Sequence, residues 1–158
     1  MIVRPFVPEM DMDMVRSAKV RKEDAEELYA SRGMDFNQYV DAVCGCPQIL
    51  NDTYIIEEDD QLIAIGGLVT SIDNVGLPWF IATELIEKYP IQTFKIMKAM
   101  LAIWKRHTKS LLNWVDIRNE KAIRFLDRLG FKWVKGFFFE GGGTHFQAFV
   151  MKGDMHNV

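Results

Sequence analysis

Apolar residues recur at helical spacing in one long segment, residues 91–107, and runs rich in β-branched and aromatic residues lie on both sides of it. The three- and four-residue intervals predict an amphipathic helix. The residues in this repeat are Phe94, Met97, Leu101 and Trp104. The flanking runs predict strands. This order of elements predicts a mixed α/β fold in which helices pack against a sheet.

The first half of the chain predicts a strand, a helical region, a hairpin and a further strand. Gly33 is placed to stop the helical region, and Asp35 can cap the short helix that follows. Asp59 and Asp60 form an acidic turn between the arms of the hairpin. The expected elements are a strand over 2–7, helices over 10–19, 20–32 and 36–43, a hairpin over 53–73 and a strand over 77–83.

The second half predicts a strand over 110–117, one more helix and a closing hairpin over 132–151. Asn119 can cap the helix and Gly130 can end it. The apolar stripe of this helix consists of Ala122, Ile123, Phe125, Leu126 and Leu129. The chain contains no internal repeat and no linker, so a single domain over 1–158 is expected.

Composition predicts a folded protein of the cytoplasm. Hydrophobic residues make up 49% and charged residues 26% of the chain, which excludes disorder and low-complexity classes. No apolar stretch approaches the ~18 residues of a membrane span. The first residues turn acidic where a secretory signal would be apolar, which argues against secretion. Cys44 and Cys46 are too close for a framework disulfide, which fits a reducing compartment.

Charge is divided unevenly along the chain. Residues 1–60 carry six Lys/Arg and fourteen Asp/Glu, and residues 85–135 carry twelve Lys/Arg and four Asp/Glu. Two interpretations explain the uneven charge. Solvated helix faces can carry charges of opposite sign, or the basic half can bind an anion such as a phosphorylated cofactor. Nucleic acid is the weaker choice of anion, because the chain is acidic as a whole, with a net charge of −3.

Two further patterns predict no site of their own. No His or further Cys lies near Cys44 and Cys46 to complete four metal ligands, so packing at a helix end explains them and no metal is expected. None of the three His residues accompanies a recognisable nucleophile, which leaves a Ser/His or Cys/His triad unsupported.

The segment Asn119–Phe131, NEKAIRFLDRLGF, follows the strand LLNWVDI and resembles the C-terminal half of the Gcn5-related N-acetyltransferase (GNAT) fold. In that family an Asn-x-x-Ala start and a Gly-Phe end bracket the helix after the fifth strand, as Asn119, Ala122, Gly130 and Phe131 do here. The opening Ile2-Val3-Arg4-Pro5 and the order of elements extend the resemblance along the chain. It implies a GNAT-like α/β (α+β) fold, with a mixed, mostly antiparallel sheet of about seven strands flanked by helices.

The resemblance also implies an activity, namely acyl transfer from acetyl-CoA to a small-molecule or protein amine. Coenzyme A would lie between the fourth and fifth strands. The cofactor-binding residues implied are Ile81, Ala82, Thr83, Asn119, Ala122 and Phe125. Helix capping alone would explain Asn119 and is the favoured interpretation, and the resemblance adds the coenzyme-facing role. Glu84 and Asp116, near the ends of the two strands, are candidate general bases if they are buried enough, and ordinary solvated carboxylates otherwise.

Two departures from the family pattern bear on catalysis. GNAT enzymes carry a glycine-rich loop that lets backbone N–H groups approach the coenzyme A pyrophosphate. The corresponding residues 84–93 contain no glycine, and they contain Pro90 and two glutamates. Many of these enzymes also carry a tyrosine seven residues after the helix-opening Asn, as the acid that protonates the leaving thiolate. Leu126 stands at that position and has no proton to donate.

The chain is more particularly similar to small GNAT-like internal virion or virion-assembly proteins of T7-type tailed phages. The matching pieces are the Arg-Pro opening, residues 62–67, 79–81 and 123–126. This similarity implies an alternative function without catalysis, through contacts with phage or host proteins in virion assembly or host takeover. The location implied is then the host cytoplasm.

Overall fold

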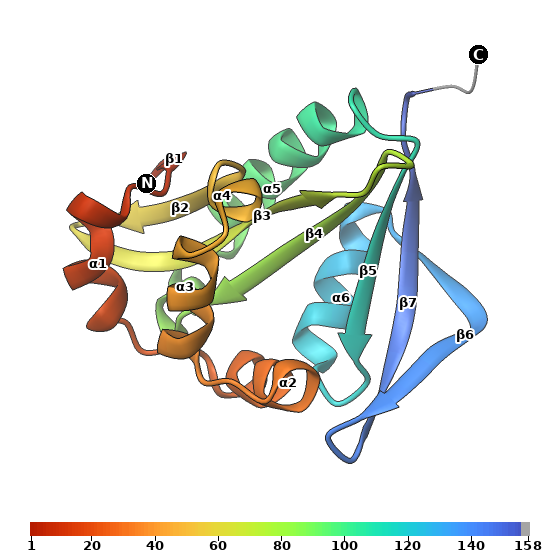
Figure 1. Ribbon diagram of the computed structural model, residues 1–158, viewed down its shortest axis with the longest axis horizontal. Helices are drawn as coiled ribbons and strands as arrows, with labels where there is room; N and C mark the ends of the chain where they lie inside the picture. The colour runs from red at the N-terminus through yellow and green to blue at the C-terminus, as the bar shows by residue number, and fades with distance from the viewer. Residues whose placement is uncertain (156–158) are drawn as a thin grey trace.

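A computed structural model describes residues 1–155 and contains one seven-stranded sheet with helices on both faces (Figure 1). The strands are β1 (Ile2–Pro5), β2 (Thr53–Glu58), β3 (Gln61–Thr70), β4 (Val75–Ala82), β5 (Ser110–Asp116), β6 (Lys132–Gly141) and β7 (Thr144–Lys152). The helices are α1 (Pro8–Arg16), α2 (Lys22–Arg32), α3 (Phe36–Cys44), α4 (Pro47–Leu50), the 3-10 helix η1 (Glu84–Lys88), α5 (Pro90–Lys105) and α6 (Glu120–Leu129).

The sheet has the strand order β1-β2-β3-β4-β5-β7-β6. All neighbouring strands run antiparallel except β4 and β5, which run parallel. These two strands pair at only two positions, Val75 with Ser110 and Gly76 with Leu111. Both strands continue for several residues past these pairs. The sheet therefore splits beyond Gly76 and Leu111 (Figure 1).

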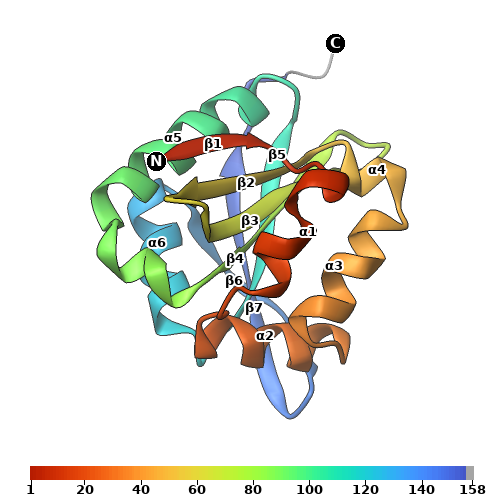
Figure 2. The same cartoon turned by 90° about the vertical axis from the view of Figure 1, so that its left-hand side faces the viewer.

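The helices form two layers on opposite faces of the sheet (Figure 2). The core on one face joins α1, α2 and α3 to the central strands through Val15, Leu28, Val40 and Ile65. The core on the other face joins α5 and α6 to β3, β5 and β7, and its buried residues include Met97, Leu101, Trp104, Leu111, Leu129 and Phe149. The helical repeat seen in residues 91–107 thus faces the sheet.

Local sequence signals begin and end the helices as expected. Gly33 ends α2 in the left-handed conformation with φ 67°, and Gly130 ends α6 with φ 104°. Asp35 caps α3, accepting a hydrogen bond from the Gln38 N–H, while the Gln38 side chain accepts one from the Asp35 N–H. Asn119 caps α6. The turn between β2 and β3 places Asp59 and Asp60 at positive φ.

The predicted mixed, mostly antiparallel sheet flanked by helices is confirmed. The first strand is shorter than expected, because it ends at Pro5 and Phe6 turns into the core. The first helix begins and ends earlier than the predicted 10–19, over Pro8–Arg16. Two short helices, α4 and η1, were absent from the expected elements. The three residues 156–158 of the expected domain lie outside the described part of the chain.

Candidate functional site at the split between β4 and β5

The split exposes one backbone N–H group at the end of each strand. The Thr83 N–H donates to Ile63 O on the β3 side, and the Ile117 N–H donates to His145 O on the β7 side. Because successive N–H groups of a strand point in opposite directions, those of Ala82 and Asp116 point into the split. A buried backbone donor needs a partner, so the structure must supply an acceptor at both positions.

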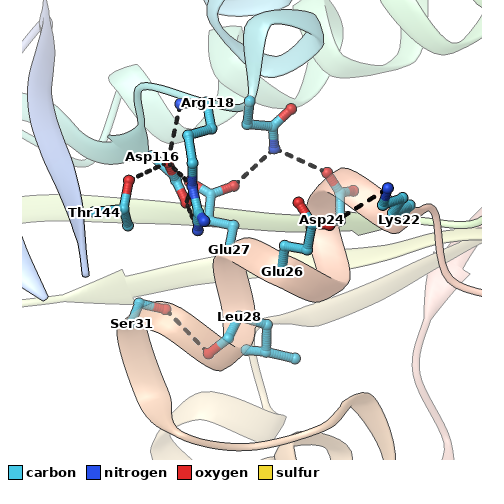
Figure 3. Close-up of polar contacts among 10 residues, drawn as sticks. Lys22, Asp24, Glu26, Glu27, Leu28, Ser31, Asp116, Arg118 and Thr144 are labelled. Carbon is cyan, nitrogen blue, oxygen red and sulfur yellow. Dashed lines mark hydrogen bonds and ion pairs between the residues drawn. The ribbon is translucent and has the colours of Figure 1, made fainter. Parts of the chain in front are cut away.

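Helix α2 supplies both acceptors, and they are carboxylates (Figure 3). Asp24 Oδ2 accepts from the Ala82 N–H at 2.7 Å, and Glu27 Oε1 accepts from the Asp116 N–H at 2.7 Å. The two side chains are three residues apart and lie on one face of the helix. Figure 3 shows both side chains on the side of α2 that faces Asp116 and Arg118, and Asp24 is only 5% exposed. Helix α2 thus bridges the split with two acidic side chains.

Asn119 connects the same carboxylates to α6. Its Oδ1 accepts from the Ala122 N–H at 3.2 Å, which confirms the predicted cap. Its Nδ2 donates to Asp24 Oδ1 at 3.1 Å and to Glu27 Oε2 at 2.9 Å. The side chain is 2% exposed, and both of its amide hydrogens have an acceptor. Asn119 therefore caps the helix and also fixes the position of α2.

The environment of Glu27 differs from that of the two candidate bases expected from the sequence. Burial raises the pKa of Glu27 to about 7. The nearby charges of Asp24 and Asp116 also raise it, whereas the hydrogen bonds from the Asp116 N–H and Asn119 lower it. This places its proton exchange near neutral pH. A carboxylate of that kind beside two diverging strands marks a candidate proton acceptor.

Asp116 and Glu84 are held by cations. Burial alone would raise the pKa of Asp116, but hydrogen bonds from the Arg118 side chain and N–H and from the Thr144 hydroxyl hold it below its usual value. Asp116 is 1% exposed and bonded on both oxygens. Glu84 lies at the surface, 3.3 Å from Lys19 Nζ. The structure places Asp116 beside Glu27 and leaves Glu84 on the outer side of η1.

An ion-pair chain crosses the split on its α6 side. Lys121 Nζ lies 2.9 Å from Glu87 of η1 and 3.2 Å from Glu23 of α2. The segment without glycine thus forms η1 and the start of α5, and one of its glutamates binds a lysine of α6. Helix α5 starts at Pro90 without a side-chain cap.

The expected apolar contacts of a cofactor lie in or beside the core. Ile81 and Ala82 are buried, and Thr83 donates its hydroxyl to Leu62 O at 2.7 Å. Phe125 stacks on Phe80 of β4 with ring centroids 6.1 Å apart and meets Phe94 of α5 edge-on at 6.3 Å. Ala122 and Leu126 pack against the same core. Ile81 belongs to the core under α1, α2 and α3, whereas Phe125, Ala122 and Leu126 belong to the core under α5 and α6, so the expected contacts are divided between the two faces of the sheet.

A groove lies next to the carboxylates, between α2, the β5–α6 turn and the β6–β7 hairpin. Its volume is about 340 Å³. Its lining residues are Ala25, Glu26, Tyr29, Ala30, Arg118 and Gly142. Arg118 also binds Asp116, whose N–H donates to Glu27, so one residue of the groove lining is hydrogen-bonded to the end of the split. It offers a solvent-open place for a small polar molecule.

Sequence reasoning named Asp116 and Asn119 and missed Asp24 and Glu27. One signal was present in the sequence. Helix α2 contains a single strongly apolar aliphatic residue, Leu28, so the face it buries has to include acidic side chains. Among residues 1–155, no three His, Cys, Asp or Glu side chains come together as they would around a metal ion. No helix in the same part of the chain is both long and apolar enough to cross a membrane.

The fold is shared with solved N-acetyltransferase structures. The yncA protein of Salmonella typhimurium, solved with its cofactor acetyl-CoA, has a TM-score of 0.72 at 13% identity, covering 99% of this chain and 96% of that one. Ribosomal-protein-alanine N-acetyltransferase from Brucella melitensis has a TM-score of 0.70 at 9% identity, and the match covers 96% of this chain and 99% of that one. Spermidine N-acetyltransferase from Vibrio cholerae, in complex with CoA and spermine, has a TM-score of 0.67 at 13% identity, and the match covers 96% of this chain and 95% of that one.

These likenesses establish a GNAT-like fold over nearly the whole chain. No protein-family profile matches the sequence, and no curated protein matches it.

Proposed function

We propose that this chain is an acyl-CoA-dependent N-acyltransferase that transfers an acetyl group from acetyl-CoA to an amine. The observation that carries the proposal is the split between β4 and β5, into which two backbone N–H groups and the carboxylate of Glu27 point. Acetyl-CoA would supply an activated thioester there. The chain would supply hydrogen-bond donors for the thioester oxygen and an acceptor for the amine proton.

The residues around the split fit part of the cofactor. Ala82 N–H is a donor of the kind that a thioester carbonyl needs, and Ile81, Phe125 and Ala122 offer apolar contacts. Lys98 and Arg124 are exposed cations on α5 and α6 that suit phosphate groups. Glu87 opposes phosphate binding at the start of α5, where the family has glycines. Positive charge on the two helices would have to replace that loop.

Glu27 is the best general base that the structure offers. A base with a pKa near the working pH combines a large ionised fraction with proton affinity. Glu27 also keeps unused lone pairs, since each of its oxygens accepts one hydrogen bond. Asp116, with its depressed pKa, and the surface residue Glu84 remain alternative bases. The neighbouring groove that contains Glu26 and Arg118 would hold the amine.

A paired assay tests this proposal. Release of the coenzyme A thiol is followed with a panel of small amines and peptide N-termini for wild type, Glu27→Gln and the control Glu9→Gln, which changes an exposed glutamate of α1 outside the groove. Loss of a positioned base costs roughly 10²- to 10⁴-fold, so Glu27→Gln should lower kcat by that factor while Glu9→Gln retains activity. No turnover by wild type, together with no calorimetric heat from millimolar acetyl-CoA, would overturn the proposal.

The salt dependence of acetyl-CoA affinity provides a second test. If exposed Lys and Arg side chains replace the glycine loop, the affinity should fall clearly as salt rises, since exposed charges are screened beyond roughly 8–10 Å at physiological ionic strength. A Kd that does not change with salt would contradict this assignment of the phosphate contacts.

The second candidate is a protein that acts through protein contacts, as the similarity to phage virion-assembly proteins implies. The observation that favours it is the aromatic surface of the edge strand β6. Its large apolar side chains Trp133, Phe137, Phe138 and Phe139 are each at least 40% exposed. Exposed aromatic groups of this kind are typical of interaction surfaces. Absence of acetyl-CoA binding, with retention of a stable fold, would favour this candidate.

A further inference from the structure

Helix α2 makes its contacts with both sides of the split through polar groups. Its N-terminal end is attached to β4, where the Arg21 N–H donates to Ala82 O at 2.9 Å and Asp24 accepts from the Ala82 N–H. One turn later, Glu27 accepts from the Asp116 N–H of β5. The helix therefore takes the place of the missing strand-to-strand pairing.

The apolar interface beneath this helix is small. Leu28 is the only large side chain of α2 that is buried, at 7% exposure, and Tyr29 is 70% exposed. An element with few buried apolar contacts undocks more readily than the rest of a fold. The hydrogen bonds of Asp24 and Glu27 thus contribute a large share of what holds α2 in place.

The groups that a thioester would need are already in use. Asp24 is bonded to the Ala82 N–H, to Asn119 and to Arg21, the last at 2.8 Å. An acyl carbonyl oxygen can accept from the Ala82 N–H only when the Asp24 carboxylate has left it, because one N–H donates one strong hydrogen bond. The ion pair of Lys121 with Glu23 holds the same helix from the α6 side, and Lys121 also pairs with Glu87 of η1.

We propose that α2 closes the acyl-CoA site by acting as an internal competitor, with the carboxylates of Asp24 and Glu27 occupying the donors that the thioester would use. This inference rests on the proposed function, since it names a regulation of the same site. Binding of acyl-CoA requires α2 to release at least the Ala82 N–H. Ligands that present an oxygen acceptor to Ala82 and Asp116 favour the open state, and the docked helix favours the closed one.

Calorimetry with acetyl-CoA on four proteins tests the competition. Asp24→Ala and Glu27→Ala each remove one acceptor, and Glu9→Ala removes the same charge from an exposed residue of α1 outside the groove. We expect Asp24→Ala and Glu27→Ala to bind acetyl-CoA at least tenfold more tightly than wild type, with Glu9→Ala unchanged. Hydrogen exchange of the Ala82 and Asp116 amides should accelerate in the first two variants only.

The outcomes separate this inference from the proposed function. Measurable binding by wild type and at least tenfold tighter binding by Asp24→Ala and Glu27→Ala would support closure by α2. Equal affinity in wild type and variants would overturn closure while leaving the function intact. Binding by none of the proteins would overturn both.

A conservative variant covers the case in which an alanine variant does not fold. In Glu27→Gln one oxygen can still accept from Asp116, but the new NH₂ group faces the Asn119 NH₂ group, which also donates. The substitution therefore weakens the contact of α2 with Asn119 while the volume of the side chain changes little. The variant should bind acetyl-CoA more tightly than wild type even as its kcat falls, whereas a lower affinity in a folded Glu27→Gln protein would overturn the inference.

Discussion

Glu27 makes the stability of this protein depend on pH near neutrality. Burial raises its pKa in the folded state to about 7 from 4.5, so between these values the folded chain holds a proton that the unfolded chain has lost. Stability should therefore fall as pH rises from about 4.5 to about 7, by up to ~1.4 kcal/mol per pH unit. Glu27→Gln cannot ionise, and urea unfolding at pH 5 and pH 8 should show a smaller loss for this variant. Equal losses in the two proteins would contradict the assignment.

Two other carboxylates act in the opposite direction and in another pH range. The pKa of Asp11 is lowered because hydrogen bonds from Arg4 and the Val7 N–H outweigh its burial, and the pKa of Asp116 is lowered in the same way by Arg118. Their stabilisation is present above the unfolded value of 3.8 and is lost as pH falls below it. A comparison between pH 5 and pH 8 therefore reports Glu27 with little contribution from either.

Phe125 lies where the two sheet halves and two helices meet. Its ring contacts Phe80 of β4 and Phe94 of α5 from its position on α6. Removing a partly buried aromatic ring from a core leaves a cavity and typically costs about 3 kcal/mol. Phe125→Ala should destabilise the fold by this amount whether or not the protein is an enzyme. Chemical denaturation measures the change, and an unaltered midpoint would mean that the ring contributes nothing to the core.

At the scale of elements, the tip of the β6–β7 hairpin fits against α2 only because it carries a glycine. A Cβ at Gly142 would lie 2.6 Å from Ala30 Cα, whereas a Cβ at Gly143 would meet open space. Both residues have positive φ, 54° and 77°, so alanine is strained at either position, by roughly 1–2 kcal/mol. Gly142→Ala should lower the melting temperature further than Gly143→Ala. The difference between the variants measures the contact of the hairpin with α2, and equal melting temperatures would exclude such a contact.

Most elements could be predicted because their signals are local. Gly33, Asp35, Asn119 and Gly130 begin or end helices through groups within a few residues, and alternating apolar runs mark the strands. Helices α4 and η1 are single short turns without a periodic pattern, so no local signal distinguishes them from loops.

The site was less predictable because its contacts are not local. Glu27 and Asp116 are 89 residues apart in the chain, and Asp24 and Asn119 are 95 apart. A helix that carries Glu23, Asp24, Glu26 and Glu27 predicts a solvated acidic face when it is read alone. Only the path of the chain across the split decides which two of the four carboxylates are turned inward.

At the scale of the whole molecule, the two oppositely charged segments meet. Lys121 of the basic segment forms an ion pair with Glu23 of the acidic one. Part of the charge asymmetry is therefore neutralised between neighbouring elements. Exposed Lys98 and Arg124 are the part of the basic segment that suits an anion.

The segment that contains α2 should be the first to open in the native protein. Trypsin can cleave after Lys22 and Arg32 in this segment, and after the exposed Lys95 and Lys98 in α5. Helix α5 buries Met97, Leu101 and Trp104, whereas α2 buries Leu28 as its only large side chain. Limited proteolysis should therefore cut at α2 well before α5. Mass spectrometry of the first fragments provides the measurement, and first cleavage in α5 would contradict the prediction.

The two-position pairing of β4 with β5 also bears on how the chain folds. Strands β2, β3 and β4 follow one another in sequence, and so do β6 and β7, so each part of the sheet can form from neighbouring segments. The parallel contact must instead wait for α5 to form a crossover, and the hydrogen bond that the Asp116 N–H donates to Glu27 closes a loop of 89 residues. Contacts between distant segments form slowly because loop closure costs entropy first. The part of the sheet that contains β2, β3 and β4 and the part that contains β6 and β7 should therefore associate late in folding, and this association should limit the refolding rate.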